Sequence, residues 1–303
     1  MRRTACRFVR RRRRPKSTDR RASDGASLPG RGALLGSAVQ RITSRNNPKL
    51  REAARLAASS RDRRKSGQCV LEGEHIVAVY GERVGRPHVL IASENALGRA
   101  GVRALAERYS ERTLVVPDAL FASIATLPAA VGVIAVIDTP QSPPPARADF
   151  CLLIDDVQDP GNVGSMLRTA AAAGAAHVLM SKGSAFAWSP KVLRAGQGAH
   201  FCVAIHEDVE LAAWASGHRA SGGEVVATVA SGGSSLYDAP LARRVAVAIG
   251  NEGAGLSAPL LAQATQRVTI PMASGVESLN AAAAAAIVLF ECVRQRDAES
   301  VER

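Results

Sequence analysis

The second half of the chain contains five short apolar runs without polar alternation, and this feature limits the possible fold most strongly. Continuous apolar runs of this length are typical of parallel strands buried on both faces of a sheet. An Ala-rich segment, Ser165–Ala173, lies between the first two runs and has the composition of a helix, so a βαβ unit is expected. We therefore predict an α/β fold with a mostly parallel sheet and helices on both faces. The five runs are Cys151–Asp155, His177–Ser181, Val225–Val229, Val245–Ile249 and Val268–Ile270.

The first half divides into three segments. Residues 1–40 contain 12 basic and 2 acidic groups and no apolar period, so they are expected to form a disordered Arg-rich leader. This leader is either an extended start of the chain or an electrostatic arm that attracts RNA without specificity. Residues 41–138 read as a small α/β domain that begins with a basic amphipathic helix after Asn46-Asn47-Pro48. Residues 139–149 are rich in proline and predict a semi-rigid linker to a domain over residues 150–297.

The net charge of +12 is concentrated at the N-terminal side. Residues 66–303 hold 18 basic and 23 acidic groups, so the body of the protein is slightly acidic. The longest apolar run, Ala281–Phe290, is about half the length of a bilayer span, and no secretory signal is present. We expect a cytoplasmic protein without membrane contact. The five cysteines show no paired spacing, so neither a disulfide framework nor a metal site is expected.

Three unusual loops follow the predicted strands: DDVQDPGNVGSMLR at 155–168, GNEGAGL at 250–256 and IPMASGVESLN at 270–280. Ligands of open parallel sheets bind outside the carboxyl ends of the strands, so these loops mark the expected site. None of them contains the dinucleotide fingerprint G-x-G-x-x-G or the phosphate loop that ends in GK[ST]. A nucleotide-dependent oxidoreductase and an NTPase therefore lack their usual signatures.

Taken together, the three loops resemble the signature motifs of the SpoU/TrmH family of RNA ribose 2′-O-methyltransferases in the SPOUT superfamily. The resemblance covers residues 150–296, and the basic start and the phrase LEGEH extend it more loosely over residues 41–137. The first motif is carried by Asn162, Gly164 and Arg168, the second by Gly250, Glu252 and Gly255, and the third by Ile270, Pro271, Met272, Ser278, Leu279 and Asn280.

The resemblance implies structural features that periodicity does not predict. Members thread the C-terminal segment through a loop and form a deep trefoil knot, which is a rare exception among folds. They enclose S-adenosylmethionine in this knot, dimerise through the knotted domain, and several carry an L30e-like RNA-binding domain in front of it. By this resemblance the expected contacts of the methyl donor are Thr228, Gly250, Gly255, Ile270 and Leu279, and no metal is expected.

Arg168 carries the catalytic role that the resemblance implies. A guanidinium is a poor resting base, so we expect Arg168 to grip the substrate phosphate and to stabilise the developing alkoxide. Asn162 would orient Arg168 or the ribose, while Glu252, Ser278 and Asn280 would shape the pocket and position the substrate. Structural roles remain open beside these: Asn162 could cap the helix near Gly164, and Ser278 or Asn280 could cap the helix that follows.

The predicted function is S-adenosylmethionine-dependent 2′-O-methylation of a ribose in structured RNA, with 23S-type rRNA favoured over tRNA. Resistance-type rRNA methylation is compatible with this layout, and a homodimer is expected. A tRNA methyltransferase remains an alternative. So does a non-catalytic RNA-binding or assembly protein on the same scaffold, although the joint presence of Arg168, Asn162 and Ser278-Leu279-Asn280 argues against it.

Overall fold

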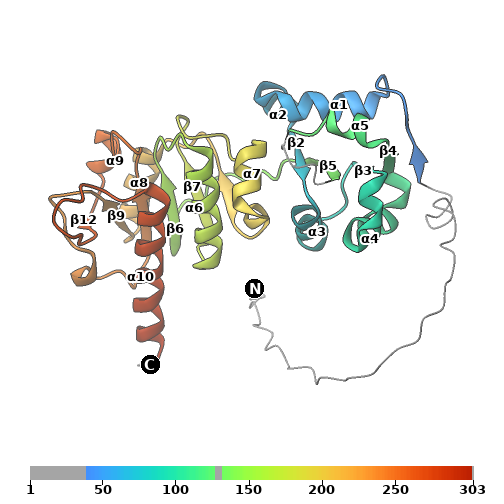
Figure 1. Cartoon of the computed structure of the whole chain (residues 1–303). Coiled ribbons are helices and arrows are strands. Elements are labelled where there is room, and N and C mark those ends of the chain that lie inside the picture. The colour runs from blue at the N-terminus through green and yellow to red at the C-terminus, as the bar shows by residue number, and fades with distance from the viewer. Residues whose placement is uncertain (1–38, 127–131, 302–303) are drawn as a thin grey trace. The chain divides into compact units, whose positions relative to one another are not determined.

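The computed structural model describes residues 39–126 and 132–301, and the strands in these ranges form two sheets (Figure 1). Most of the Arg-rich leader predicted over residues 1–40 lies outside the described residues. Within the described ranges, no helix is both long and apolar enough to cross a membrane.

The first sheet has five strands in the order β1-β4-β3-β5-β2. β5 runs antiparallel to β3 and β2, whereas β3, β4 and β1 are parallel. Helices cover both faces, with α1 and α5 packed on one and α3 and α4 on the other. The bounds are β1 Gln40–Arg41, α1 Pro48–Ala58, α2 Ser60–Ser66, β2 Gln68–Glu72, α3 Glu74–Arg83, β3 Val89–Ser93, η1 Asn95–Gly98, α4 Ala100–Arg108, η2 Ser110–Arg112, β4 Thr113–Val116, α5 Asp118–Ala122 and β5 Val133–Asp138.

The predicted basic helix is divided into two helices, α1 and α2. Ser59 is extended (φ −121°, ψ 115°) and its side chain accepts a hydrogen bond from the Asp62 N–H, which begins α2. Arg63 turns back toward the end of α1, where its guanidinium donates to the carbonyls of Leu56 and Ala57. A helix break therefore buries one arginine among the basic residues, while the other arginines of α1 and α2 remain exposed.

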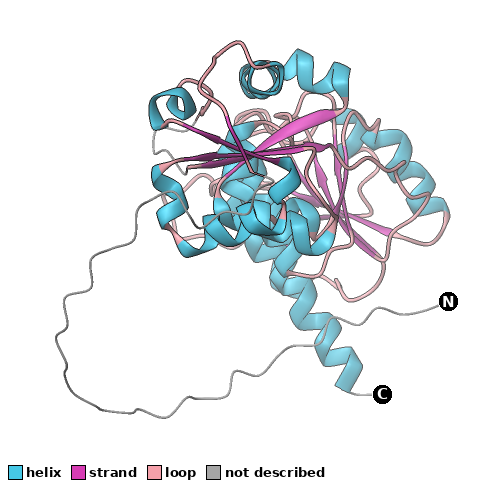
Figure 2. Cartoon of the chain, turned by 90° about the vertical axis from the view of Figure 1, so that its right-hand side faces the viewer, coloured by secondary structure: helices cyan, strands magenta, loops and turns pink. Residues whose placement is uncertain are grey.

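The second sheet has seven strands, all parallel, in the order β10-β12-β9-β11-β6-β7-β8. The predicted parallel α/β fold is thus confirmed, and helices cover both faces of the sheet (Figure 2). The helices α6, α7 and α10 pack on one face, and α8 and α9 on the other. The bounds are β6 Phe150–Ile154, α6 Pro160–Ala172, β7 His177–Met180, α7 Pro190–Gly196, η3 Ala199–Phe201, β8 Ala204–His206, α8 Leu211–Ala220, β9 Glu224–Thr228, β10 Ser234–Ser235, η4 Leu236–Asp238, β11 Val245–Ile249, α9 Ala258–Leu261, β12 Gln266–Thr269 and α10 Ala281–Val301.

Two predicted helix starts need comment. α6 begins at Pro160 rather than at Ser165, because the Asp159 side chain accepts from the Asn162 N–H at 2.7 Å and caps the helix. The interpretation of Asn162 as a cap was therefore wrong. The cap predicted at Asn280 is confirmed, since its Oδ1 accepts from the N–H groups of Ala282 and Ala283 at 2.9 and 3.2 Å.

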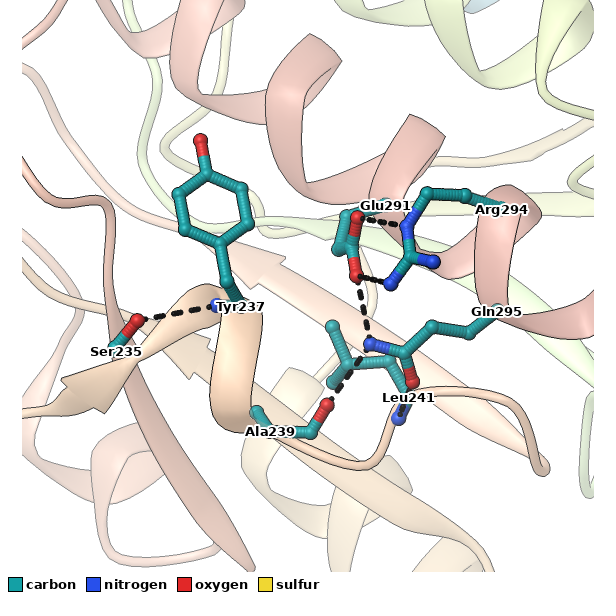
Figure 3. Close-up of polar contacts among 7 residues, drawn as sticks. All are labelled: Ser235, Tyr237, Ala239, Leu241, Glu291, Arg294 and Gln295. Carbon is teal, nitrogen blue, oxygen red and sulfur yellow. Dashed lines mark hydrogen bonds and ion pairs between the residues drawn. The ribbon is translucent and has the colours of Figure 1, made fainter.

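A polar cluster fixes the closing helix α10 to the segment before β11 (Figure 3). The Gln295 side chain donates to the Ala239 carbonyl at 3.0 Å and accepts from the Leu241 N–H at 2.7 Å. Glu291, only 7 % exposed, accepts from Gln295 and Arg294. These bonds hold α10 against the sheet, and the knot stays a prediction.

The predicted linker coincides with the interval between the two sheets. β5 ends at Asp138 and β6 begins at Phe150, so residues 139–149 belong to neither sheet. The domain limits 41–138 and 150–297 stay predictions.

Candidate functional site

The predicted site loops meet at the carboxyl edge of the seven-stranded sheet. β11 lies between β9 and β6, and Ile249 pairs with Ile154 while Ala248 pairs with Ala227. The residues after these strands therefore start at the same height and on neighbouring strands. This register brings the Asp155 loop, the Gly250 loop and Thr228 together, although they are far apart in the sequence.

A cavity of about 550 Å³ opens between the Gly250 loop, the 270–280 loop and the start of α10. A cavity of this size accommodates a nucleoside-sized ligand. All five residues expected to contact the methyl donor line it: Thr228, Gly250, Gly255, Ile270 and Leu279. Glu252 and Ser278 line it too, whereas Asn162, Arg168 and Asn280 do not.

Thr228 provides a test of whether this cavity suits a polar ligand. Its hydroxyl is buried and has no hydrogen-bond partner among the described residues. A buried hydroxyl without a partner is costly, so a donor or acceptor from a ligand in the cavity would relieve the cost. The backbone of the Gly250 loop also lines the cavity and would supply further contacts. These residues fit the adenosine part of S-adenosylmethionine.

Gly250 is required by a close approach within its own loop. The loop closes on itself through paired 2.9 Å hydrogen bonds between the backbones of Asn251 and Gly255. A Cβ atom on Gly250 would lie 2.2 Å from the carbonyl carbon of Gly255. Gly255 itself has φ 72°, which favours glycine. The glycines of this motif therefore keep the loop tight around the cavity.

Gly164, the glycine of the first motif, is required for a different reason than Gly250. It lies where α6 and α7 pack, and a Cβ atom there would lie 2.4 Å from Cβ of Ala195 and 2.7 Å from the Val192 carbonyl oxygen. This glycine serves helix packing and makes no direct contribution to the cavity lining.

A hydrogen-bonded chain joins one residue from each motif. Asn280 Nδ2 donates to Asn162 Oδ1 at 2.9 Å, and Asn162 Nδ2 donates to Glu252 Oε1 at 2.9 Å. Burial raises the pKa of Glu252, but the hydrogen bonds from Asn162 and from backbone N–H groups outweigh this effect and leave the pKa below its usual value. Glu252 is therefore a carboxylate at neutral pH and a fixed acceptor for Asn162.

Arg168 is not part of this hydrogen-bonded chain. It lies on α6, is exposed, and its side chain makes no hydrogen bond or ion pair with any residue that the structure describes. Ser278 is exposed in the 270–280 loop at the edge of the cavity. The structure thus brings together Asn162, Glu252 and Asn280, while the guanidinium of Arg168 is left available to a partner.

Two residues that hold the loops were not singled out as site residues. Asp155, 5 % exposed, accepts from the Ser257 N–H at 2.8 Å, and Asn251 donates to the Asp156 carbonyl at 2.8 Å. Asp155 and Asp156 therefore fix loops, and Asp159 caps α6. In the ranges that the structure describes, no group of three or more His, Cys, Asp or Glu residues could hold a metal ion.

Comparison with known proteins gives the same family as the loops. The model of the SpoU rRNA methylase family matches residues 149–290. A protein of Synechocystis described as an uncharacterized tRNA/rRNA methyltransferase is 33 % identical, with 88 % of this chain and 98 % of the relative covered. The 23S rRNA (guanosine(2553)-2′-O)-methyltransferase RlmP of Bacillus subtilis is 30 % identical over 83 % of this chain and 98 % of its own. The SpoU methyltransferase AviRb of Streptomyces viridochromogenes, solved with AdoMet, has a TM-score of 0.74 at 28 % identity, with 83 % of this chain and 98 % of that chain covered.

Proposed function

Because this chain belongs to the SpoU rRNA methylase family, we propose that it transfers the methyl group of S-adenosylmethionine to a ribose 2′-oxygen in structured RNA of the 23S rRNA type. One observation carries the proposal: Glu252 lines the nucleoside-sized cavity and is also the acceptor of the Asn280–Asn162 chain. The donor pocket and the polar group expected to position the ribose therefore share a residue.

The bound donor would supply an electrophilic methyl group on sulfur, and the residues of this chain would orient its acceptor. Thr228 and the backbone of the Gly250 loop would hold the adenosine part. Glu252, ionised and fixed by hydrogen bonds, would keep the Asn162 amide in one orientation toward the substrate. Alignment of the 2′-oxygen with the methyl carbon contributes to the rate enhancement of such a transfer.

Arg168 would act on the RNA rather than on the donor. Its exposed guanidinium has no protein partner in the described residues, and guanidinium groups bind phosphate through paired N–H donors. In this position it would grip the phosphate beside the target ribose and stabilise the negative charge that develops on the 2′-oxygen.

The helices α1 and α2 would supply further attraction for RNA. Six basic side chains on them are exposed, and such a cluster attracts the phosphate backbone without sequence specificity. These six are Lys49, Arg51, Arg55, Arg61, Arg64 and Lys65. The name of the Bacillus subtilis relative supports rRNA over tRNA, and action on rRNA supports a cytoplasmic location.

A homodimer is part of the proposal. Large apolar side chains are exposed on or beside α10, including Phe290 at 48 % and Leu279 at 37 %. Tyr237, 56 % exposed, lies just before the segment that Gln295 fixes to α10, and its side chain takes no part in that cluster (Figure 3). A second copy packed on α10 would bury these side chains. Light scattering at micromolar concentration should give twice the chain mass of 31.7 kDa, and a monomeric mass would contradict the dimer.

The reaction is tested by supplying labelled S-adenosylmethionine with rRNA and tRNA from a strain that lacks the corresponding gene. We expect label in one ribose of 23S rRNA, mapped as a 2′-O-methyl nucleotide, and none in tRNA. Label in tRNA alone would mean that the substrate is tRNA and not 23S rRNA. Donor binding without transfer to either RNA would favour a non-catalytic RNA-binding protein.

A further inference from the structure

The cavity of about 550 Å³ described above, proposed to hold the methyl donor, is called the donor cavity below. A second cavity, of about 410 Å³, shares no lining residue with it. Arg63 and Arg64 of α2 line one side, and the start of the 139–149 segment lines another. The remaining wall contains Phe186 and Trp188, from the segment before α7, and Glu207, which follows β8. The walls thus combine aromatic rings, guanidinium groups and a carboxyl group.

Two arginines lie against the Phe186 ring. The guanidinium carbon of Arg64 is 4.3 Å from the ring centroid and that of Arg63 is 5.7 Å away. Arg63 is 5 % exposed and its Nε has no hydrogen-bond partner among the described residues. Arg64 pairs with Asp208 at 2.9 Å, but both side chains are more than 40 % exposed. An exposed ion pair of this kind is weak, so Arg64 can leave Asp208 to contact a ligand in the cavity.

Glu207 offers an unused acceptor at this cavity. One of its carboxyl oxygens, Oε1, accepts from the Ala187 N–H at 2.8 Å. The other has no hydrogen-bond partner among the residues that the structure describes. Burial raises the pKa of Glu207 to about 7, so this carboxyl group changes between acceptor and donor near neutrality.

We propose that this cavity binds an unpaired nucleobase of the RNA substrate, stacked against Phe186 and Arg64 and hydrogen-bonded along its edge by Glu207. The inference rests on the proposed function. Sequence-specific RNA recognition uses unstacked bases that lie on aromatic rings or guanidinium planes and are hydrogen-bonded along their edges. The volume suits a base with part of its ribose.

The cavity carries charges of both signs, because Arg63 and Arg64 line it together with Glu207 and Asp208, so a neutral base suits it better than a phosphate. Glu207 and Asp208 would repel a phosphate at the wall that they form. Arg61 and Lys65, exposed on the same helix as Arg64, would instead hold the phosphates outside. The RNA would then be held at a point other than the methyl-transfer site, which selects among RNA loops without changing the chemistry.

Phe186→Leu tests the stacking contact, since it removes the aromatic face and retains an apolar side chain. We expect the Kd and the KM for unmodified 23S rRNA to rise about tenfold, with kcat and the affinity for S-adenosylmethionine unchanged. An unchanged KM in a variant that unfolds at the wild-type temperature would overturn the proposal. A rise in KM together with a fall in kcat would indicate that Phe186 has only a structural role, and this result would also count against the proposal.

Two arginine variants provide a matched pair in which both substituted side chains are exposed, so neither substitution disturbs the protein core. Arg64→Gln and Arg61→Gln each remove one exposed positive charge from α2, but only Arg64 lines the cavity. Arg64→Gln should weaken rRNA binding several-fold more than Arg61→Gln at the same salt concentration. Equal effects would mean that only non-specific attraction is present.

Photo-crosslinking locates the base directly. A 23S rRNA transcript that contains 4-thiouridine should crosslink to the peptide around Phe186 and Trp188 in the wild-type protein. Crosslinks confined to α1, which contributes no residue to the cavity, would exclude a base in it. If the wild-type protein methylated no RNA, the proposed function would fail; if it methylated rRNA while Phe186→Leu behaved like wild type, only this inference would fail.

Discussion

The donor cavity and the second cavity are built in different ways. The donor cavity is formed by consecutive residues of short loops at the ends of parallel strands, with glycines and backbone groups as its main surface. The second cavity is formed by long side chains from four separate segments. A site made of loop backbone constrains the residue types around it, whereas a site made of long side chains leaves no local pattern. The two cavities should therefore respond differently to substitution.

The largest expected effect separates chemistry from donor binding. Arg168→Ala should lower kcat at least about 100-fold, because the developing oxyanion loses its charged partner. The affinity for S-adenosylmethionine, measured by calorimetry, should remain unchanged, since Arg168 does not line the donor cavity. Arg219→Ala, which removes an exposed arginine from α8, is the control and should retain full activity. Substantial turnover in Arg168→Ala would remove this residue from the mechanism.

The next effect concerns the tightness of the Gly250 loop. Gly250→Ala places a methyl group against the Gly255 backbone, so the loop must open and the donor affinity should fall at least about tenfold. Gly217→Ala, on α8 and outside the cavity, meets no atom within 4 Å and should bind the donor as wild type does. Equal donor affinities for the two variants would show that close packing in this loop does not shape the cavity.

A smaller effect distinguishes the two roles of Asn280. Asn280→Asp keeps an oxygen that can cap α10 but loses the amide that donates to Asn162. Its unfolding temperature should stay within a degree or two of wild type, while kcat falls about tenfold through the unpaired Asn162 oxygen. Asn280→Ala should lose both stability and activity. Wild-type kcat in Asn280→Asp would mean that the hydrogen-bonded chain of Asn280, Asn162 and Glu252 does not position the substrate.

The smallest effect is a pH dependence of stability at the second cavity. The pKa of Glu207 is raised to about 7 by burial, with the Arg64 charge and the Ala187 N–H opposing the shift. Its contribution to stability is therefore present at low pH and is lost as the pH rises through 7. Asp208 and His206 also line this cavity.

Urea unfolding at pH 6 and pH 8 measures this contribution. The loss of stability between these pH values should be smaller in Glu207→Gln than in wild type. Glu210→Gln, at an exposed position nearby, should behave as wild type. If Glu207→Gln and wild type lost the same free energy of unfolding between pH 6 and pH 8, the titrating group would not be Glu207.

The sequence predicted most of what depends on local pattern. The strand Val245–Ile249 was placed to the residue, because its apolar run is short and lies between Arg244 and Gly250. The start of α6 was misplaced by five residues, since Pro160 was taken as part of the loop and the capping side chain is Asp159. The segments that contain α7 and β8 were not recognised as elements, because both are short and interrupted by polar residues.

The sequence by itself determined the parallel fold, the family and the loops that form the donor cavity, because each depends on residue types at fixed spacing within a few turns of chain. The tertiary structure decided which of these residues meet. Asn280 and Asn162 lie 118 positions apart, and Asn162 and Glu252 lie 90 apart, yet both pairs are within 2.9 Å. Strand order and register produce such contacts, as they produce the unpartnered hydroxyl of Thr228 and the cavity around Phe186 and Glu207. No periodicity along the chain encodes contacts between side chains that only packing brings together.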